Sequence, residues 1–126
     1  MKKLIQFVLL LLLQLCCATN SCAQEQVTTD PDLEMKDNLY KKYKNEVRAF
    51  SHKDFDEFFM EFFSKQNQEQ ALSKEEYYTY TIKIAIYSEK LGLLYKNQKD
   101  VAQKSKKEWF EKRYSDYLSN RPKNKP

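Results

Sequence analysis

Apolar residues are most concentrated between positions 73 and 95, in the stretch SKEEYYTYTIKIAIYSEKLGLLY. Arranged as a helix, which turns about 100° per residue, this stretch has two apolar faces. One face holds Tyr77, Tyr80, Ile84, Tyr87, Leu91 and Leu94, and the other holds Tyr78, Ile82, Ile86 and Leu93. A helix that is apolar on two sides contacts more than one neighbour, so residues 74–96 are predicted to form the central helix of the domain.

The same stretch also carries the pattern of a β-strand. Residues 78–86 alternate between larger apolar and mostly polar side chains, which is typical of a half-buried strand. Ser73 and Glu76, however, have the spacing of a helical capping box, and Leu72 and Tyr77 have that of a hydrophobic staple. Because both start signals belong to helices, we favour the helix and keep the strand as the alternative.

A column of small residues separates the two apolar faces. It consists of Thr81, Ala85, Ser88 and Gly92. Their intervals of four, three and four place them on one line along a helix. Small side chains let a second helix approach closely, so we expect Gly92 to lie at a contact between two helices.

An amphipathic helix is predicted at residues 31–50. Asp30 is the expected N-cap and Pro31 the expected first helical residue, because the fixed φ of proline suits that position. The apolar stripe consists of Leu39, Tyr40, Tyr43, Val47 and Phe50. Basic side chains occupy the other side, as expected of a helix with one buried face.

A shorter helix, predicted at residues 52–65, carries a row of phenylalanines. Ser51 and Asp54 approximate a capping box at its start. The row consists of Phe55, Phe58, Phe59, Phe62 and Phe63. We expect this face to pack in the core against the central helix, because monomeric proteins rarely expose apolar patches of that size. A ligand groove is the alternative.

The last helix is predicted at residues 100–119, with Asp100 as its candidate cap and Trp109 in the core. Five polar residues, 96–100, favour a turn before it. Neither proline nor glycine interrupts that turn, so a single helix over residues 74–119 stays open as an alternative.

Together these elements predict an all-α fold, a small single-domain bundle of about four helices over residues 30–120. One glycine and three prolines in 126 residues argue against an all-β fold, which needs many tight turns. Residues 24–29 are expected to form a polar tether, and residues 121–126 a frayed basic tail.

The N-terminal segment has the organisation of a cleaved signal peptide. Two lysines precede an apolar run at residues 4–15, which is too short to cross a bilayer because a spanning helix needs about 20 residues. Ser21 and Ala23 are small residues at the positions that a signal peptidase reads. We therefore expect cleavage after residues 1–23, with Gln24 as the new N-terminus and no transmembrane helix in the mature chain.

A bacterial lipoprotein signal is the alternative, because Ser21 directly precedes Cys22 as at the end of a lipobox. Thr19 and Asn20 do not fit the rest of that motif. Both readings predict export, to the periplasm or the medium in the first case and to a membrane through a lipid anchor at Cys22 in the second. All three cysteines lie in this segment, so a chain beginning at Gln24 has no disulfide and no thiol nucleophile.

Charge is distributed unevenly along the chain. Without the two N-terminal lysines, 20 basic and 18 acidic residues remain. Residues 24–76 hold 13 acidic and 8 basic residues, a net charge of −5, whereas residues 96–126 hold 10 basic and 4 acidic residues, a net charge of +6. The C-terminal part is therefore the candidate surface for an acidic partner.

Candidate catalytic and metal-binding groups are few. His52 is the only histidine, so a Cys–His pair or a catalytic triad is poorly supported. Four carboxylates lie close in sequence without the glycine turn of a calcium loop: Asp54, Asp56, Glu57 and Glu61. The sequence assigns no catalytic residue, metal ligand or cofactor. It predicts a protein that is not an enzyme, with a carboxylate-dependent hydrolase as the least favoured alternative.

The candidate partner-binding surface is the basic face of the last predicted helix. Its residues are Lys104, Lys106, Lys107, Lys112 and Arg113. A protein partner or an anionic envelope surface would suit this charge, whereas export argues against nucleic acid. A solvated helix face without a partner is the alternative. We expect an exported, non-enzymatic, bacterial-type interaction or accessory module, with an inhibitor or immunity-type binding protein as a related alternative.

Overall fold

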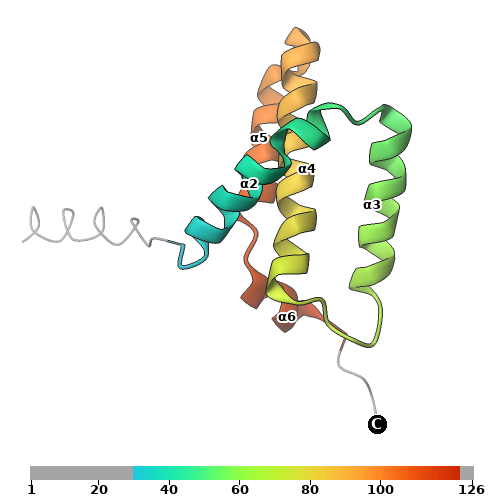
Figure 1. Cartoon of the computed structure of the whole chain (residues 1–126), viewed down its shortest axis with the longest axis vertical. Coiled ribbons are helices and arrows are strands. Elements are labelled where there is room, and N and C mark those ends of the chain that lie inside the picture. The colour runs from blue at the N-terminus through green and yellow to red at the C-terminus, as the bar shows by residue number, and fades with distance from the viewer. Residues whose placement is uncertain (1–29, 123–126) are drawn as a thin grey trace, which may run out of the picture. The chain divides into compact units, whose positions relative to one another are not determined.

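The central apolar stretch forms one helix, α4, around which the other helices pack (Figure 1). The computed structural model describes residues 30–122. Its elements, in chain order, are α2 (Leu33–Arg48), α3 (His52–Gln66), α4 (Lys74–Leu94), the short 3-10 helix η1 (Lys96–Gln98), α5 (Lys99–Glu111) and α6 (Tyr114–Asn120). No strand occurs within residues 30–122, so the predicted all-α fold is confirmed and the strand alternative is wrong.

Within the described part, residues 32–122 belong to one compact unit, whose boundary with the preceding segment falls after Pro31. The expected signal peptide, the lipid anchor at Cys22 and the tether lie outside the described residues, as does the end of the expected tail at residues 123–126. Among the helices of the described part, none combines the length and apolar character needed to span a bilayer.

Helix α4 is buried on nearly all sides. Between Tyr77 and Ser88 only Thr79 and Lys83 are partly exposed. The alternation that resembled a strand therefore arises because a surrounded helix has apolar residues almost all around, with one narrow polar strip. The predicted capping box is confirmed, since Ser73 Oγ accepts the Glu76 N–H and the Glu76 carboxylate accepts the Ser73 N–H.

The small-residue column of α4 faces α5. Ser88 Oγ lies 3.1 Å from Ser105 Oγ, and a Cβ on Gly92 would lie 2.9 Å from the Ala102 Cβ. Gly92 therefore lies at a helix–helix contact, as predicted. Because α4 ends at Leu94 and η1 reverses the chain, the single helix over residues 74–119 is not formed.

Aromatic rings fill the space between α3 and α4. Phe55 stacks on Tyr87 with ring centroids 3.9 Å apart, and Phe62 stacks on Tyr80 at 4.9 Å. The capping box that starts α3, formed by Ser51 and Asp54, is also present as predicted. Ring-to-ring packing accordingly holds α3 in place.

The phenylalanine row is wider than this contact. Phe62 is 2% exposed, whereas Phe63 is 57% exposed. Phe59 has an intermediate exposed fraction of 36%. The expectation that the whole row is core is thus wrong for Phe63, because α3 meets its neighbours along one side only. Trp109 is half-buried and packs against the core beside Phe62.

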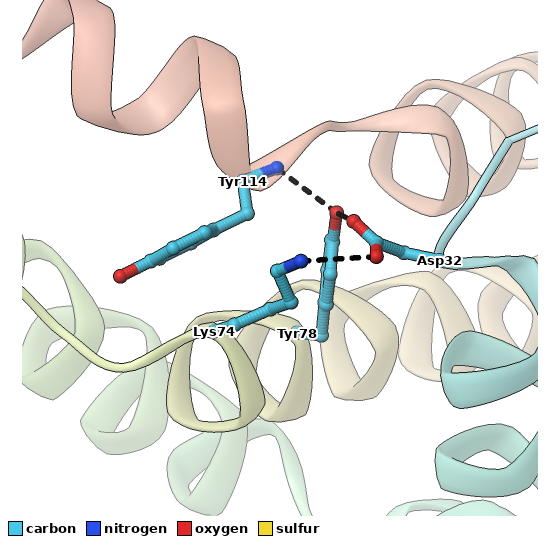
Figure 2. Close-up of polar contacts among 4 residues, drawn as sticks. All are labelled: Asp32, Lys74, Tyr78 and Tyr114. Atoms are coloured by element: carbon cyan, nitrogen blue, oxygen red, sulfur yellow. Dashed lines mark hydrogen bonds and ion pairs between the residues drawn. The ribbon is translucent and has the colours of Figure 1, made fainter.

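Helix α2 begins later than predicted. It starts at Leu33 rather than Pro31, and Asp32 occupies the N-cap position in place of Asp30. The Asp32 side chain makes no capping bond, because its carboxylate accepts the Tyr78 hydroxyl at 2.6 Å and the Lys74 ammonium at 3.2 Å (Figure 2). A contact with α4 has replaced the local cap.

The last predicted helix is divided into α5 and α6. Lys112 and Arg113 have extended backbone, and the N–H of Tyr114 donates to the Tyr78 hydroxyl at 3.0 Å (Figure 2). The hydroxyl of Tyr114 in turn donates to the Leu72 carbonyl at 2.6 Å. The prediction of one helix over residues 100–119 is wrong because these contacts dock α6 against the start of α4.

Two smaller expectations also fail at the ends of these helices. Helix α5 begins at Lys99 without a side-chain cap, so Asp100 is not its N-cap. Arg121 is not frayed, because its guanidinium donates to the carbonyls of Gln68 and Glu69, both at 2.7 Å. The start of the expected tail is therefore tied to the loop between α3 and α4.

Candidate partner-binding surface

Two of the titratable side chains of α3 that were considered as catalytic or metal-binding groups make structural contacts. His52 is exposed at the helix start, with Nδ1 3.1 Å from the Tyr87 hydroxyl. Glu61 accepts the Tyr80 hydroxyl at 3.0 Å and pairs with Lys65 at 3.2 Å, and hydrogen bonds from these two groups lower the pKa of its carboxyl. Within residues 30–122, no three His, Cys, Asp or Glu side chains gather in a way that could hold a metal ion.

The five basic residues singled out from the sequence fall into two groups. Lys104, Lys106 and Lys107 lie on α5, whereas Lys112 and Arg113 lie in the bend before α6. The break between the helices separates the groups, so they do not line one continuous helix face. The Lys112 ammonium lies 4.7 Å from the centroid of the Trp109 ring.

Lys106 takes part in a network centred on Glu89 of α4. The Glu89 carboxylate accepts the hydroxyl of Tyr40 and pairs with Lys106 at 3.2 Å and Arg48 at 3.8 Å. Residues from α2, α4 and α5 thereby meet at one carboxylate. Lys106 is thus an internal tie between helices as well as a surface charge.

Burial by itself would raise the pKa of the Glu89 carboxyl, but the hydrogen bonds from Tyr40 and Lys106 and the charge of Arg48 hold that pKa below its usual value. Burial and the neighbouring carboxylate raise the pKa of Tyr40 to about 12. Sequence reasoning missed this site. Its only signal was that Glu89 is the sole acidic residue between positions 77 and 94.

Beside this network lies a groove between α2 and α5. Its volume is about 450 Å³, within the range of small-ligand pockets. It is lined by Asp37, Tyr40, Gln103, Lys106, Lys107, Phe110 and Glu111. The rings of Tyr40 and Phe110 form its apolar part. Its charged residues balance, with Lys106 and Lys107 against Asp37 and Glu111. We call these seven residues the α2–α5 groove.

A second, smaller cleft of about 280 Å³ lies where the end of α3 meets α6. Lys112, Arg113 and Arg121 contribute positive charge to it, and Asp116 contributes one negative charge. The Arg121 guanidinium is already bound to backbone carbonyls, so fewer donors are available for a ligand than the charges suggest. Burial and the charge of Asp116 raise the pKa of Tyr77, in its wall, to about 12.

Chemically, the α2–α5 groove can accept an apolar side chain and hold a neighbouring carboxylate against a lysine. The carboxylate of Glu89 is occupied by its partners and lies in a network that stabilises the bundle.

The sequence has no significant match among protein-family models, curated proteins or solved structures.

Proposed function

We propose that this chain is an exported, non-enzymatic binding module that contacts a protein partner through the α2–α5 groove. The observation that carries the proposal is that two aromatic rings, those of Tyr40 and Phe110, line the same groove as Lys106 and Lys107. Aromatic residues are enriched in protein interfaces, and flanking charges steer association and select the partner. The partner chemistry that fits is an apolar segment flanked by carboxylates.

The charge on α5 supports an acidic partner. Lys104 and Lys107 are exposed, and Lys107 has only a long contact of 4.0 Å with Glu111. An exposed pair of this kind contributes little to stability, so Lys107 can exchange it for a partner's carboxylate. Lys106 differs, because its pairing with Glu89 joins two helices.

Site-specific photo-crosslinking tests the location of the contact. A photoreactive residue at Gln103, which lines the groove, should capture a partner in cells, and the same residue at Glu57 on α3 serves as the matched exposed control. Mass spectrometry identifies what is captured. Capture at Glu57 but not at Gln103 would place the contact outside the groove.

A charge test follows once the partner is purified. Changing Lys104, Lys107 and Lys112 to Gln should lower association without altering the fold, and binding should weaken as salt rises, because exposed charges are screened within about 8 Å at physiological salt. Lys106 is left unchanged because of its structural pairing. Lys53→Gln, on α3, is the control. If neither salt nor the three substitutions change the affinity for the partner, the basic surface is not the site of contact.

Export has its own test. The intact mass of the protein recovered from expressing cells should correspond to a chain beginning at Gln24, since Ser21 and Ala23 fit a signal peptidase. An acylated N-terminal Cys22 would replace soluble export by lipid anchoring. An unprocessed chain in the cytoplasm would refute export.

A further inference from the structure

The junction of α4 and α5 exposes apolar side chains that no part of the described chain covers. Four residues are more than half exposed there: Leu93 at 68%, Leu94 at 61%, Tyr95 at 53% and Val101 at 72%. We call these four residues the hairpin tip. Figure 1 shows this end of the hairpin, drawn in orange, lying beyond the ends of α2 and α3. The two apolar faces of α4 thus continue past the point where their neighbours end.

The hairpin tip is held in a defined geometry. Gly92 and Ala102 bring the two helices close together directly below it, and the Ser88–Ser105 contact at 3.1 Å lies one turn further down. Helices that approach so closely have little freedom to fold the apolar residues inward. Their exposure is therefore a consequence of the packing beneath them.

Positive charge predominates in the segment that carries the hairpin tip. Residues 93–104 contain Lys96, Lys99 and Lys104 and one acidic residue, Asp100. All three lysines are exposed, and no ion pair within residues 30–122 involves them. Apolar side chains with lysines beside them suit the boundary of an anionic bilayer, because lysine stems lie along apolar surface while the ammonium reaches the headgroups. A tyrosine such as Tyr95 is also favoured at that boundary.

The comparably exposed apolar residues of α3 have acidic neighbours instead. Met60 and Phe63, on α3, are 64% and 57% exposed, which is comparable with the hairpin tip. Their helix carries the carboxylates Asp56, Glu57 and Glu61 beside them. An anionic surface would repel α3, so the two apolar patches differ in the surface they fit.

We infer that the hairpin tip docks on the surface of an anionic phospholipid bilayer, with Leu93 and Leu94 entering the headgroup boundary and Lys96 and Lys99 contacting the phosphates. This goes beyond the proposed protein contact, because Leu93, Leu94, Lys96 and Lys99 do not line the α2–α5 groove and the inference does not depend on it. Partial insertion of a few apolar residues with adjacent lysines gives reversible, composition-dependent binding.

Vesicle co-sedimentation tests the inference. The protein is residues 24–126, which contain the core cluster of the described residues and exclude the apolar run at residues 4–15 that would bind lipid by itself. Binding to phosphatidylcholine vesicles that contain phosphatidylglycerol should exceed binding to phosphatidylcholine alone and should fall as salt rises. Leu93→Gln with Leu94→Gln should lower partitioning at least about ten-fold, because the inserted apolar area is lost.

Charge and control variants complete the design. Lys96→Gln with Lys99→Gln should lower partitioning into the anionic vesicles about five-fold per lysine. Met60→Gln with Phe63→Gln, equally exposed on α3, should leave partitioning unchanged. A urea melt of each variant confirms that it is folded.

Three results would overturn the inference. One is no binding to anionic vesicles, or equal binding to both kinds. Another is an equal loss in the Met60 and Phe63 control, which would indicate unspecific apolar adhesion. The third is a dimer in light scattering without vesicles that Leu93→Gln with Leu94→Gln converts to a monomer, since the hairpin tip would then serve a second copy of the chain.

Discussion

The hydroxyl of Tyr78 accepts the backbone N–H of Tyr114 at 3.0 Å, across 36 residues of sequence. The same hydroxyl donates to Asp32 at 2.6 Å, so one buried side chain links the start of α2, the centre of the bundle and the start of α6 (Figure 2). The position of α6 therefore depends on a group in α4.

Removing this hydroxyl should destabilise the bundle. Tyr78→Phe keeps the ring but deprives the Tyr114 N–H of its acceptor, and we expect a loss of about 1–3 kcal/mol in the free energy of unfolding, measured by urea denaturation. Tyr95→Phe is the matched control because that side chain is 53% exposed, and its effect should stay within about 0.5 kcal/mol. Equal stability of both variants would show that the hydroxyl has no such role.

Enlarging Gly92 should separate α4 from α5. A Cβ added at this position would lie only 2.9 Å from the Ala102 Cβ, so Gly92→Leu should overpack the contact and cost about 1–3 kcal/mol in a denaturant melt. Asn45→Leu, at an exposed position of α2, controls for adding a large apolar side chain to a helix. A stabilised Gly92→Leu protein would contradict the close approach of the two helices.

The attachment of α3 should depend on Phe62 far more than on Phe63. Phe62 is 2% exposed and touches Tyr80 and Trp109, so Phe62→Ala should cost about 3–5 kcal/mol. Phe63→Ala, one residue away and 57% exposed, should cost much less. If Phe62→Ala does not fold, Phe62→Leu keeps most of the volume and allows the comparison by urea melt. Equal costs at both positions would contradict the burial pattern.

Glu89 should contribute stability that acid removes. Its folded-state pKa lies below the ordinary value of 4.5, so the folded protein disfavours protonation and the contribution is fully present above that pH. It should fade as the pH falls through the folded-state pKa. The difference in unfolding free energy between the natural chain and Glu89→Gln should therefore be largest near neutral pH and shrink below pH 4.5. Glu108→Gln, at an exposed position of α5, is the control and should not show a pH-dependent difference in unfolding free energy. If the difference for Glu89→Gln does not change with pH, the lowered pKa of Glu89 is contradicted.

Residue spacing by itself determined the helical class and the starts of α3 and α4. Ser51 with Asp54, and Ser73 with Glu76, are local signals, because both partners of each capping box lie within one turn of helix. The helix–helix contact at Gly92 could also be predicted from the sequence, because a column of small residues along one line of a helix predicts a close approach whichever helix is the neighbour.

Where a local signal competes with a partner that is distant in sequence, only the tertiary structure decided the outcome. Asp32 binds Tyr78 instead of capping α2, and Tyr114 finds an acceptor in Tyr78, which divides the last predicted helix. The same holds for the candidate surface, because Lys106 meets Glu89 only when α4 and α5 pack. The sequence pattern places Leu93 on an apolar face of the central helix. Whether a neighbour covers this side chain depends on how far the adjacent helices extend, which is a property of the assembled bundle.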